Sequence, residues 1–521
     1  MEFIISPLLV LSCHPLHMLC ICINGYVGRS FESLHLRSEH MGAIKGADYI
    51  NRINQLKNEV WFDGKKVEGL LSEFPAFKEL LRIKASLYDL QHDPKIKDEM
   101  TFASPVSGER VGMSYLQPKT KEDIKKRRKM IEHWARHTNG ILGRSPDYLN
   151  TVLMSFASST SFLEGKENCF PENVQAFFEF ARENDLTFTH TFISPQVNRS
   201  PYYIEKTEQP IAAKIVGETE EGLIIKGARL LATQGGLTDE VLVVSGSKFL
   251  FNEDETFAFA IPSNTKGLKF ICRDTFIGGN SSFDHPLSSK YEEIDSTVVF
   301  DNVVVPWERV FYYKNESVGP NFLTQSSFHH FAKHQAIIRQ IAKTEFLLGI
   351  AELLTKTINV SDFQHIQEKM SEIIIGLETM KALLDKAENN AALNDFGYMC
   401  PDIHSLRVAG CIFPKVYPRF VEIIQIIGAS GMINLPTEQA FQSAIKPDLD
   451  QYLQAANNNA ENRVKIFRLA WDITMSAFGT RQTQYERYFF GDPISLSSEL
   501  YKTYPKQPYV EKVNEFLNLN K

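Results

Sequence analysis

Apolar residues recur with three different spacings along this chain, and the spacing divides it into three zones. From residue 41 to residue 186 they recur every three to four positions, which predicts amphipathic helices. The clearest stretches are residues 74–92, 120–138, 146–159 and 171–184. Thr120 is expected to cap the second stretch, since Glu122 and Asp123 follow it in the first turn. Residues 41–186 therefore read as an N-terminal helical domain.

The period shortens to two in the middle of the chain. Alternating apolar residues separated by Gly, Asn and Asp predict strands. These strands are expected within residues 211–233, 239–246, 256–264, 268–274 and 296–311. Residues 187–320 are therefore expected to form a β domain.

Helical spacing returns in residues 321–521, with long apolar stripes in residues 331–357, 362–392 and 418–431. Helices of this length and one-sided apolarity pack into bundles and often into oligomers. The predicted fold class is α+β, with an N-terminal helical domain, a central β domain and a C-terminal bundle. Clefts at the domain junctions are the expected ligand sites.

The first forty residues do not follow this pattern. They contain an apolar run, but Glu2 precedes it and prolines and histidines interrupt it, unlike a secretory signal. We interpret residues 1–40 as a leader that is non-native or disordered, with Met41 as the natural start.

Charge and cysteine content exclude several classes of function. The 521 residues include 56 Lys and Arg against 63 Asp and Glu, a net charge of −7 without a basic block, so neither nucleic acid nor membrane is an expected partner. Seven scattered cysteines indicate neither a disulfide framework nor a zinc ribbon. They favour a reducing compartment, and we expect a cytoplasmic protein.

One candidate binding motif is GRSPDYLN, residues 143–150. Ser145 is expected to cap a helix whose first residue is Pro146. Arg144 and Tyr148 are four apart, so their polar groups can meet beside the helix start, where an oxyanion such as a phenolate is stabilised. A solvated arginine at an ordinary helix start is the alternative.

A second candidate motif is LTFTHTFISPQVNRS, residues 186–200, at the change from helical to β spacing. His190 is either a hydrogen-bonded core residue or part of a site. Pro195, Gln196, Asn198 and Arg199 form a polar loop, which suits a flat heteroaromatic or phosphate-bearing ligand.

Weaker signals are a glycine break and a histidine pair. Residues 425–431 contain two glycines that either end a helix or let backbone approach a cofactor. His330 and His334 have metal-like spacing but no third ligand nearby in sequence, so we expect no metal. The fingerprints of Rossmann, P-loop, zincin and α/β-hydrolase proteins are missing from the sequence.

These motifs, together with KGARLLAT, FDHPLSS, VPWERVF and YERYFFGDP, resemble the large-component family of 4-hydroxyphenylacetate 3-monooxygenases. The resemblance runs from residue 41 to the C-terminus. It implies an oxygenase with the acyl-CoA dehydrogenase type of fold, which uses reduced flavin.

The resemblance also implies roles for individual residues. It places the catalytic and phenol-binding groups at Arg144, Tyr148 and His190, and the loop over the substrate tail at Gly246 and Ser247. A neighbouring subunit would touch flavin through residues 425–431. The implied flavin contacts are His190, Thr191, Phe192, Gln196, Val197, Asn198, Arg199, Thr233, Asp492, Pro493, Ile494 and Ser495.

The implied reaction adds a hydroxyl ortho to the hydroxyl of a para-substituted phenol, such as 4-hydroxyphenylacetate, and gives a catechol. FADH2 and dioxygen would react to a flavin C4a-hydroperoxide, which transfers its distal oxygen. Because the sequence has no nicotinamide fingerprint, the resemblance implies a separate NAD(P)H-flavin reductase, and it implies a homotetramer.

Other activities on the same fold stay open. They are a chlorophenol-type monooxygenase with His329 or His330 as base, an acyl-CoA dehydrogenase, a flavin and iron-sulfur dehydratase, and a non-catalytic scaffold. The dehydratase needs cysteine ligands where this chain has Arg144 and Tyr148, which argues against a cluster.

Overall fold

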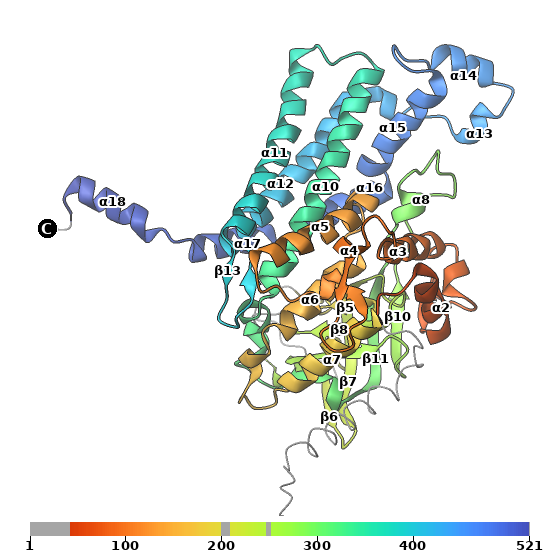
Figure 1. The fold of residues 1–521 in the computed structure, drawn as a ribbon. Coiled ribbons are helices and arrows are strands. Elements are labelled where there is room, and N and C mark those ends of the chain that lie inside the picture. Colours follow the sequence, from red (N-terminus) through yellow and green to blue (C-terminus); the bar gives the residue numbers. More distant parts are fainter. Residues whose placement is uncertain (1–41, 199–208, 246–251, 520–521) are drawn as a thin grey trace, which may run out of the picture.

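The computed structural model describes residues 42–198, 209–245 and 252–519. The predicted leader lies outside these ranges, as do the predicted ligand contacts Arg199, Gly246 and Ser247. In Figure 1 a bundle of long helices stands at the top, the sheets lie below it, and N-terminal helices pack beside both. The predicted α+β arrangement, with helices before and after a central β region, is confirmed.

The N-terminal part is mostly helical, as its spacing predicts. Thr120 caps the third main helix: its side chain accepts a hydrogen bond from the Asp123 N–H, and its own N–H donates to the Asp123 carboxylate. The main helices are α2 (Gly46–Leu56), α3 (Lys78–Leu90), α5 (Lys121–His137), α6 (Pro146–Ala157) and α7 (Pro171–Asn184). Every residue of α6 is buried, so this helix crosses the interior.

The N-terminal part also contributes to the large sheet, which its helical spacing does not predict. Strand β1 (Val60–Phe62) pairs in parallel with β10 (Leu268–Cys272). Three residues are too few to show a period of two, so only the pairing with β10 identifies this strand.

Two sheets form the centre of the molecule. The large one has the order β2-β1-β10-β11-β7-β6, and the small one has the order β12-β9-β8-β5. Phe259 of β9 meets Phe300 of β11 edge-on at 6.2 Å, so apolar faces of the two sheets pack together. The remaining bounds are β2 (Lys65–Lys66), β5 (Phe188–Thr191), β6 (Lys214–Glu218), β7 (Gly222–Thr233), β8 (Glu240–Val244), β9 (Phe257–Pro262), β11 (Asp295–Pro306) and β12 (Val310–Tyr313).

The C-terminal bundle surrounds one long buried helix, α10 (Phe328–Thr357). Its neighbours are α11 (Gln364–Asn389), α12 (Ile403–Gly428), α15 (Ala460–Thr474) and α16 (Ala477–Tyr488). Arg339 and Lys343 of α10 both bond to the carboxylate of Glu486 on α16, at 2.6 to 2.9 Å, in a site closed to solvent. This buried network fixes the register of α16 against α10.

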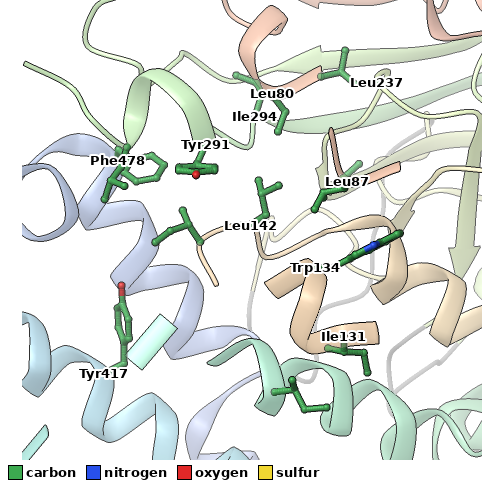
Figure 2. Packing of buried hydrophobic residues seen from close by; sticks show 14 of the residues in the cluster. Leu80, Leu87, Ile131, Trp134, Leu142, Leu237, Tyr291, Ile294, Tyr417 and Phe478 are labelled. Atoms are coloured by element: carbon green, nitrogen blue, oxygen red, sulfur yellow. The ribbon is translucent and has the colours of Figure 1, made fainter. Parts of the chain in front are cut away.

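One apolar core joins all three parts of the molecule. Figure 2 shows Leu80 and Leu87 of α3 and Trp134 of α5 near Leu237 and Ile294 of the β region. Phe478 and Tyr417 of the bundle belong to the same cluster. Because the core is continuous, the helix start that carries Arg144 is held between the β region and the bundle.

Two helices at the C-terminus leave the bundle. Helix α17 (Pro493–Thr503) contacts α12, and α18 (Gln507–Leu517) projects away from the body in Figure 1. Neither helix has a buried residue. Within the described ranges, the structure has no helix that combines the length and the apolarity needed to cross a bilayer.

Candidate active site

The start of α6 presents Arg144 and Tyr148 together. Pro146 occupies the first helical position, as predicted, and Ser145 precedes it. The predicted capping bond is wrong, however: the Ser145 hydroxyl donates to the Asp147 carboxylate at 2.5 Å and caps no backbone N–H. Burial raises the pKa of Asp147 above its usual value, and this carboxylate also accepts a bond from Gln335.

The guanidinium of Arg144 is surrounded by aromatic rings. It lies 4.3 Å from the centre of the Tyr148 ring, 4.3 Å from that of Phe489 and 5.4 Å from that of Tyr485. Its Nη1 donates to the Gly143 carbonyl at 3.3 Å, and its buried Nε has no partner. In the described part of the chain no acidic side chain pairs with this guanidinium. An unpaired, half-buried cation on aromatic faces is suited to bind an anion.

His190 approaches the same place from the β region. It lies on β5, is buried, and has its ring centre 6.0 Å from that of Tyr148 and 4.6 Å from that of Phe192. Among the described residues, no protein group hydrogen-bonds to the His190 ring or the Tyr148 hydroxyl. His190 and Tyr148 are only 8% and 4% exposed, and the lack of a protein partner leaves their polar groups able to bind a ligand.

The electrostatics set the protonation states of these groups. Burial, and next the charge of Arg144, lower the pKa of His190 well below its usual value, so the imidazole is neutral near pH 7. Burial raises the pKa of Tyr148, against the opposing charges of Arg144 and Arg339. A protonated phenol and a guanidinium therefore stand ready to donate hydrogen bonds, beside an imidazole that can accept one.

The structure brings several of the predicted flavin contacts together. Strand β5 itself lies beside β7: the Thr191 hydroxyl donates to the Leu230 carbonyl at 2.9 Å, and the Thr189 hydroxyl donates to the Thr233 carbonyl at 2.8 Å. The Thr233 hydroxyl donates to Asp295 at 2.8 Å. Thr191, Phe192 and Thr233 thus lie near one another, and Gln196, Val197 and Asn198 are exposed beyond them.

The second predicted flavin segment lies at the start of α17. Asp492 caps this helix by accepting a bond from the Ser495 N–H at 2.9 Å, with Pro493 in the first turn. Ile494 is 80% exposed. In the described ranges no hydrogen bond links this segment to the β5 loop, so its flavin contact stays a prediction. It begins three residues after Phe489, whose ring lies over Arg144.

Residues 425–431 lie at the end of α12. The helix ends at Gly428, and Ala429 follows with φ 46°. A Cβ on Gly428 would lie 2.4 Å from Met432, so this glycine permits a close contact inside the protomer. The predicted contact of these residues with a neighbouring flavin stays a prediction.

The three other histidines named in the sequence analysis have protein partners. His330 Nδ1 bonds to the Pro401 carbonyl at 2.9 Å, and His334 Nε2 bonds to Glu388 at 2.8 Å. His329 lies against the ring of Phe328, which in turn meets Phe192. Across the described residues, no group of three or more His, Cys, Asp or Glu side chains is arranged to hold a metal ion.

Sequence reasoning missed four residues that shape this site: Gln234, Glu293, Tyr485 and Phe489. Tyr485 and Phe489 are four apart in YERYFF, so a helix places both rings on one face. Glu293 follows another acidic residue in YEEIDS, and no spacing distinguishes it from its neighbour. Only the folded chain shows that Glu293 contacts Gly143 and Arg144.

The sequence matches known family models and curated proteins. Residues 45–312 match the family model for the 4-hydroxyphenylacetate 3-hydroxylase N terminal region, and residues 320–518 match the model for its C terminal region. A Bacillus subtilis protein named probable 4-hydroxyphenylacetate 3-monooxygenase is 63% identical, over 92% of this chain and 99% of that protein. A Thermus thermophilus protein named 4-hydroxyphenylacetate 3-monooxygenase oxygenase component is 43% identical, over 91% of this chain and 97% of that one.

Solved structures agree with these relatives. The chain is similar to a crystal structure of a 4-hydroxyphenylacetate 3-monooxygenase oxygenase component complexed with FAD and 4-hydroxyphenylacetate, at 42% identity and a TM-score of 0.86. That match covers 91% of this chain and 98% of the other. An archaeal 4-hydroxybutyryl-CoA dehydratase shares the fold, with a TM-score of 0.81 at 17% identity over 92% of this chain and 96% of that one.

The two family models together span nearly the whole described chain, and the relatives are matched almost from end to end. The resemblance read from the sequence motifs is thereby confirmed. This protein belongs to the 4-hydroxyphenylacetate 3-hydroxylase family.

Proposed function

We propose that this chain is the oxygenase component of a two-component monooxygenase that hydroxylates a phenol. The substrate is a para-substituted phenol such as 4-hydroxyphenylacetate, and the product is the catechol that carries the new hydroxyl ortho to the first. FADH2 is the flavin and dioxygen is the co-substrate. The names of the relatives support this activity, and so does the flavin and substrate complex of a protein 42% identical to this one.

The observation that carries the proposal is the convergence of Arg144, Tyr148 and His190. They come from the segment before α6, from α6 and from β5, yet the Arg144 guanidinium lies on the Tyr148 ring and the His190 ring is 6.0 Å from it. A phenol whose oxygen meets these groups would be stabilised as it gains negative charge. Attack on a phenol ring is easiest at the carbon beside a hydroxyl that is ionised or strongly hydrogen-bonded, so this stabilisation speeds ring hydroxylation.

Each residue then has a distinct role. Arg144 and Tyr148 donate hydrogen bonds to the phenol oxygen, while His190 accepts its proton or shares it. Because the pKa of His190 is well below its usual value, sharing the proton is favoured over complete transfer. Phe192 and Phe489 add apolar walls, which exclude water around the reacting ring.

The residues around β5 fit a flavin. The buried His190 imidazole has no partner in the described chain, and the adjacent loop Gln196–Asn198 exposes amide side chains, which suit a polar heteroaromatic ring. Thr191, Phe192, Val197, Thr233 and the start of α17 complete the proposed contacts. Reduced flavin, once bound, supplies the electrons that activate dioxygen for transfer to the ring.

The proposal includes two kinds of protein partner and a location. A separate NAD(P)H-flavin reductase would deliver FADH2, consistent with relatives named as oxygenase components. A homotetramer would give a partner to the exposed apolar residues of α18, among them Tyr509, Val513 and Phe516. The cytoplasm is the proposed location.

The test is to reduce FAD chemically without oxygen, mix it with the protein and 4-hydroxyphenylacetate, and then add air-saturated buffer. Chromatography should detect a catechol product that requires both the protein and the phenol. Hydrogen peroxide measured in parallel gives the fraction of flavin oxidised without hydroxylation. A panel of para-substituted phenols identifies the preferred para substituent. If none of them gives a catechol while flavin binding is intact, the proposal is refuted.

A further inference from the structure

Glu293 is a fully buried carboxylate beside the start of α6, and both of its oxygens bind the backbone there. It lies two residues before the start of β11 and has no exposed surface. Its Oε2 accepts the Gly143 N–H at 2.8 Å, and its Oε1 accepts the Arg144 N–H at 2.8 Å. Two charge-assisted bonds from consecutive peptide groups fix the direction of the chain at this point.

Gln234 adds a third bond to the same segment. Its side-chain amide donates to the Arg144 carbonyl at 3.0 Å and to Glu293 Oε1 at 3.0 Å. Its own N–H donates to the Ile294 carbonyl at 2.7 Å, so the ends of β7 and β11 are joined beneath Arg144. The β region therefore binds both the N–H and the carbonyl of Arg144.

Tyr485 closes the other side of this segment. A Cβ at Gly143 would lie 2.2 Å from Cε1 of Tyr485, so only glycine fits between the ring and the carboxylate. The same ring lies 5.4 Å from the Arg144 guanidinium. Gly143 and Arg144 are thus held in place by contacts with Glu293, Gln234 and Tyr485.

The charge of Glu293 is compensated without the Arg144 guanidinium. Arg481 Nη1 lies 3.7 Å from Glu293 Oε2, and Arg481 is itself anchored by two 2.8 Å bonds to Asp295. An acidic residue near an active-site arginine commonly pairs with it and would then compete with an anionic ligand. Here the carboxylate is occupied by backbone N–H groups, and the guanidinium stays available.

We infer that Glu293 is a positioning residue for the phenol site: it holds the backbone of Arg144 so that the guanidinium faces the phenol oxygen unpaired. This inference rests on the proposed function, which places the phenol oxygen at Arg144. Glu293 contacts neither flavin nor phenol in this role. Its effect reaches the substrate through the orientation of Arg144.

The test uses Glu293→Gln with Glu292→Gln as the matched control. Glutamine keeps one acceptor oxygen but replaces the other with an NH2 group, which cannot accept the second backbone N–H. Glu292 is the adjacent buried acid, and its carboxylate bonds to Arg273 and to the Phe276 N–H, away from Gly143 and Arg144. Both variants lose one buried charge next to the same strand.

The probe is 4-nitrophenol, whose phenolate absorbs visible light whereas the neutral phenol does not. Equilibrium dialysis against full-length protein, with and without FAD, gives its affinity, and absorbance gives the ionised fraction of the bound probe. Wild type and Glu292→Gln should lower the pKa of the bound probe by about one unit or more. Glu293→Gln should bind about tenfold more weakly and return the probe pKa toward its solution value.

The possible outcomes separate the inference from the proposed function. Wild-type affinity and ionisation in Glu293→Gln would overturn the positioning role. If the wild-type protein itself binds no phenolate, or Arg144→Met binds it equally well, the proposed phenol site fails instead. If Glu293→Gln does not fold, Glu293→Asp decides, since its shorter side chain keeps the charge but cannot reach both backbone N–H groups as glutamate does; an unchanged probe pKa there would equally overturn the role.

Discussion

The guanidinium of Arg144 lies 4.3 Å from the centre of the Tyr148 ring, in a cation–π contact across the first turn of α6. Arg144 precedes the helix, which begins at Pro146, so its place over the ring depends on the backbone at Gly143 and Arg144, which Glu293 binds. Phe489, from the opposite end of the chain, approaches the same guanidinium at 4.3 Å. The cation is therefore held by aromatic rings, and apart from the Nη1 bond to the Gly143 carbonyl its hydrogen-bond donors are left for a ligand.

Replacing Arg144 tests whether this cation binds the phenol oxygen. Arg144→Lys keeps the charge but loses the planar fork of donors, so kcat/KM for 4-hydroxyphenylacetate should fall about 10- to 100-fold. Steady-state catechol formation at saturating FADH2 measures the change. Arg136→Lys, an exposed arginine on α5, should leave kcat/KM within about twofold of wild type. Equal rates for the two variants would remove Arg144 from the site.

His190→Ala should reduce coupled hydroxylation at least about tenfold while FADH2 binding remains detectable, because it removes the acceptor for the phenol proton. The pKa of His190 already lies well below its usual value, so the imidazole stays neutral as the pH rises from 6.5 to 8. The loss of rate should therefore be the same across this range. Single-turnover measurements at several pH values give the ratio, and an unchanged yield of catechol would contradict the role.

Glu486→Gln should destabilise the bundle by about 3 to 5 kcal/mol, since Arg339 and Lys343 would be left buried without a carboxylate. Burial opposes ionisation of Glu486, but Arg339 and Lys343 outweigh it and lower its pKa to about 2. This depressed pKa gives stability above the unfolded pKa of about 4.3 that is lost as the pH falls toward 2.

Urea unfolding at one fixed protein concentration measures the effect of Glu486→Gln. Glu461→Gln is the control, because its pair with Lys465 is exposed and should contribute less than about 1 kcal/mol. Equal unfolding free energies for the two variants would show that the buried network is not the source of stability.

Gly143→Ala should destabilise the protein by about 1 to 3 kcal/mol, because the new methyl group enters the space of the Tyr485 ring. Gly349→Ala, in the exposed face of α10 with open space around it, should be neutral or stabilising by up to about 1 kcal/mol. Urea unfolding compares the two substitutions. A Gly143→Ala protein as stable as wild type would mean that the ring of Tyr485 yields easily.

Val513→Asp should lower the oligomeric state, because it puts a charge into the apolar stripe of α18. Tyr509, Val513 and Phe516 of this stripe are 60%, 55% and 85% exposed, and an 11-residue helix is marginally stable in water without a partner. Light scattering after size exclusion measures the mass. Asn514→Asp adds the same charge outside the stripe and should not change it; equal masses for wild type and Val513→Asp would exclude α18 from the interface.

Much of the fold follows from local pattern. The helices α3, α5, α6 and α7 lie where three-to-four spacing predicts them, and Thr120 caps α5 as its neighbours indicate. Strand β1 was not predictable, because three residues carry no period and its identity depends on β10. The Ser145 cap was predicted wrongly: the hydroxyl donates to the Asp147 carboxylate at 2.5 Å and accepts no backbone N–H.

The sequence alone determined the family and the order of helical and β regions, because each depends on neighbours along the chain. Tertiary structure decided how the site residues are used. It places His190 beside Tyr148 and Phe489 over Arg144. Two backbone N–H groups bind the Glu293 carboxylate. These contacts join residues 42 to 345 positions apart, so they depend on packing, which residue spacing does not record.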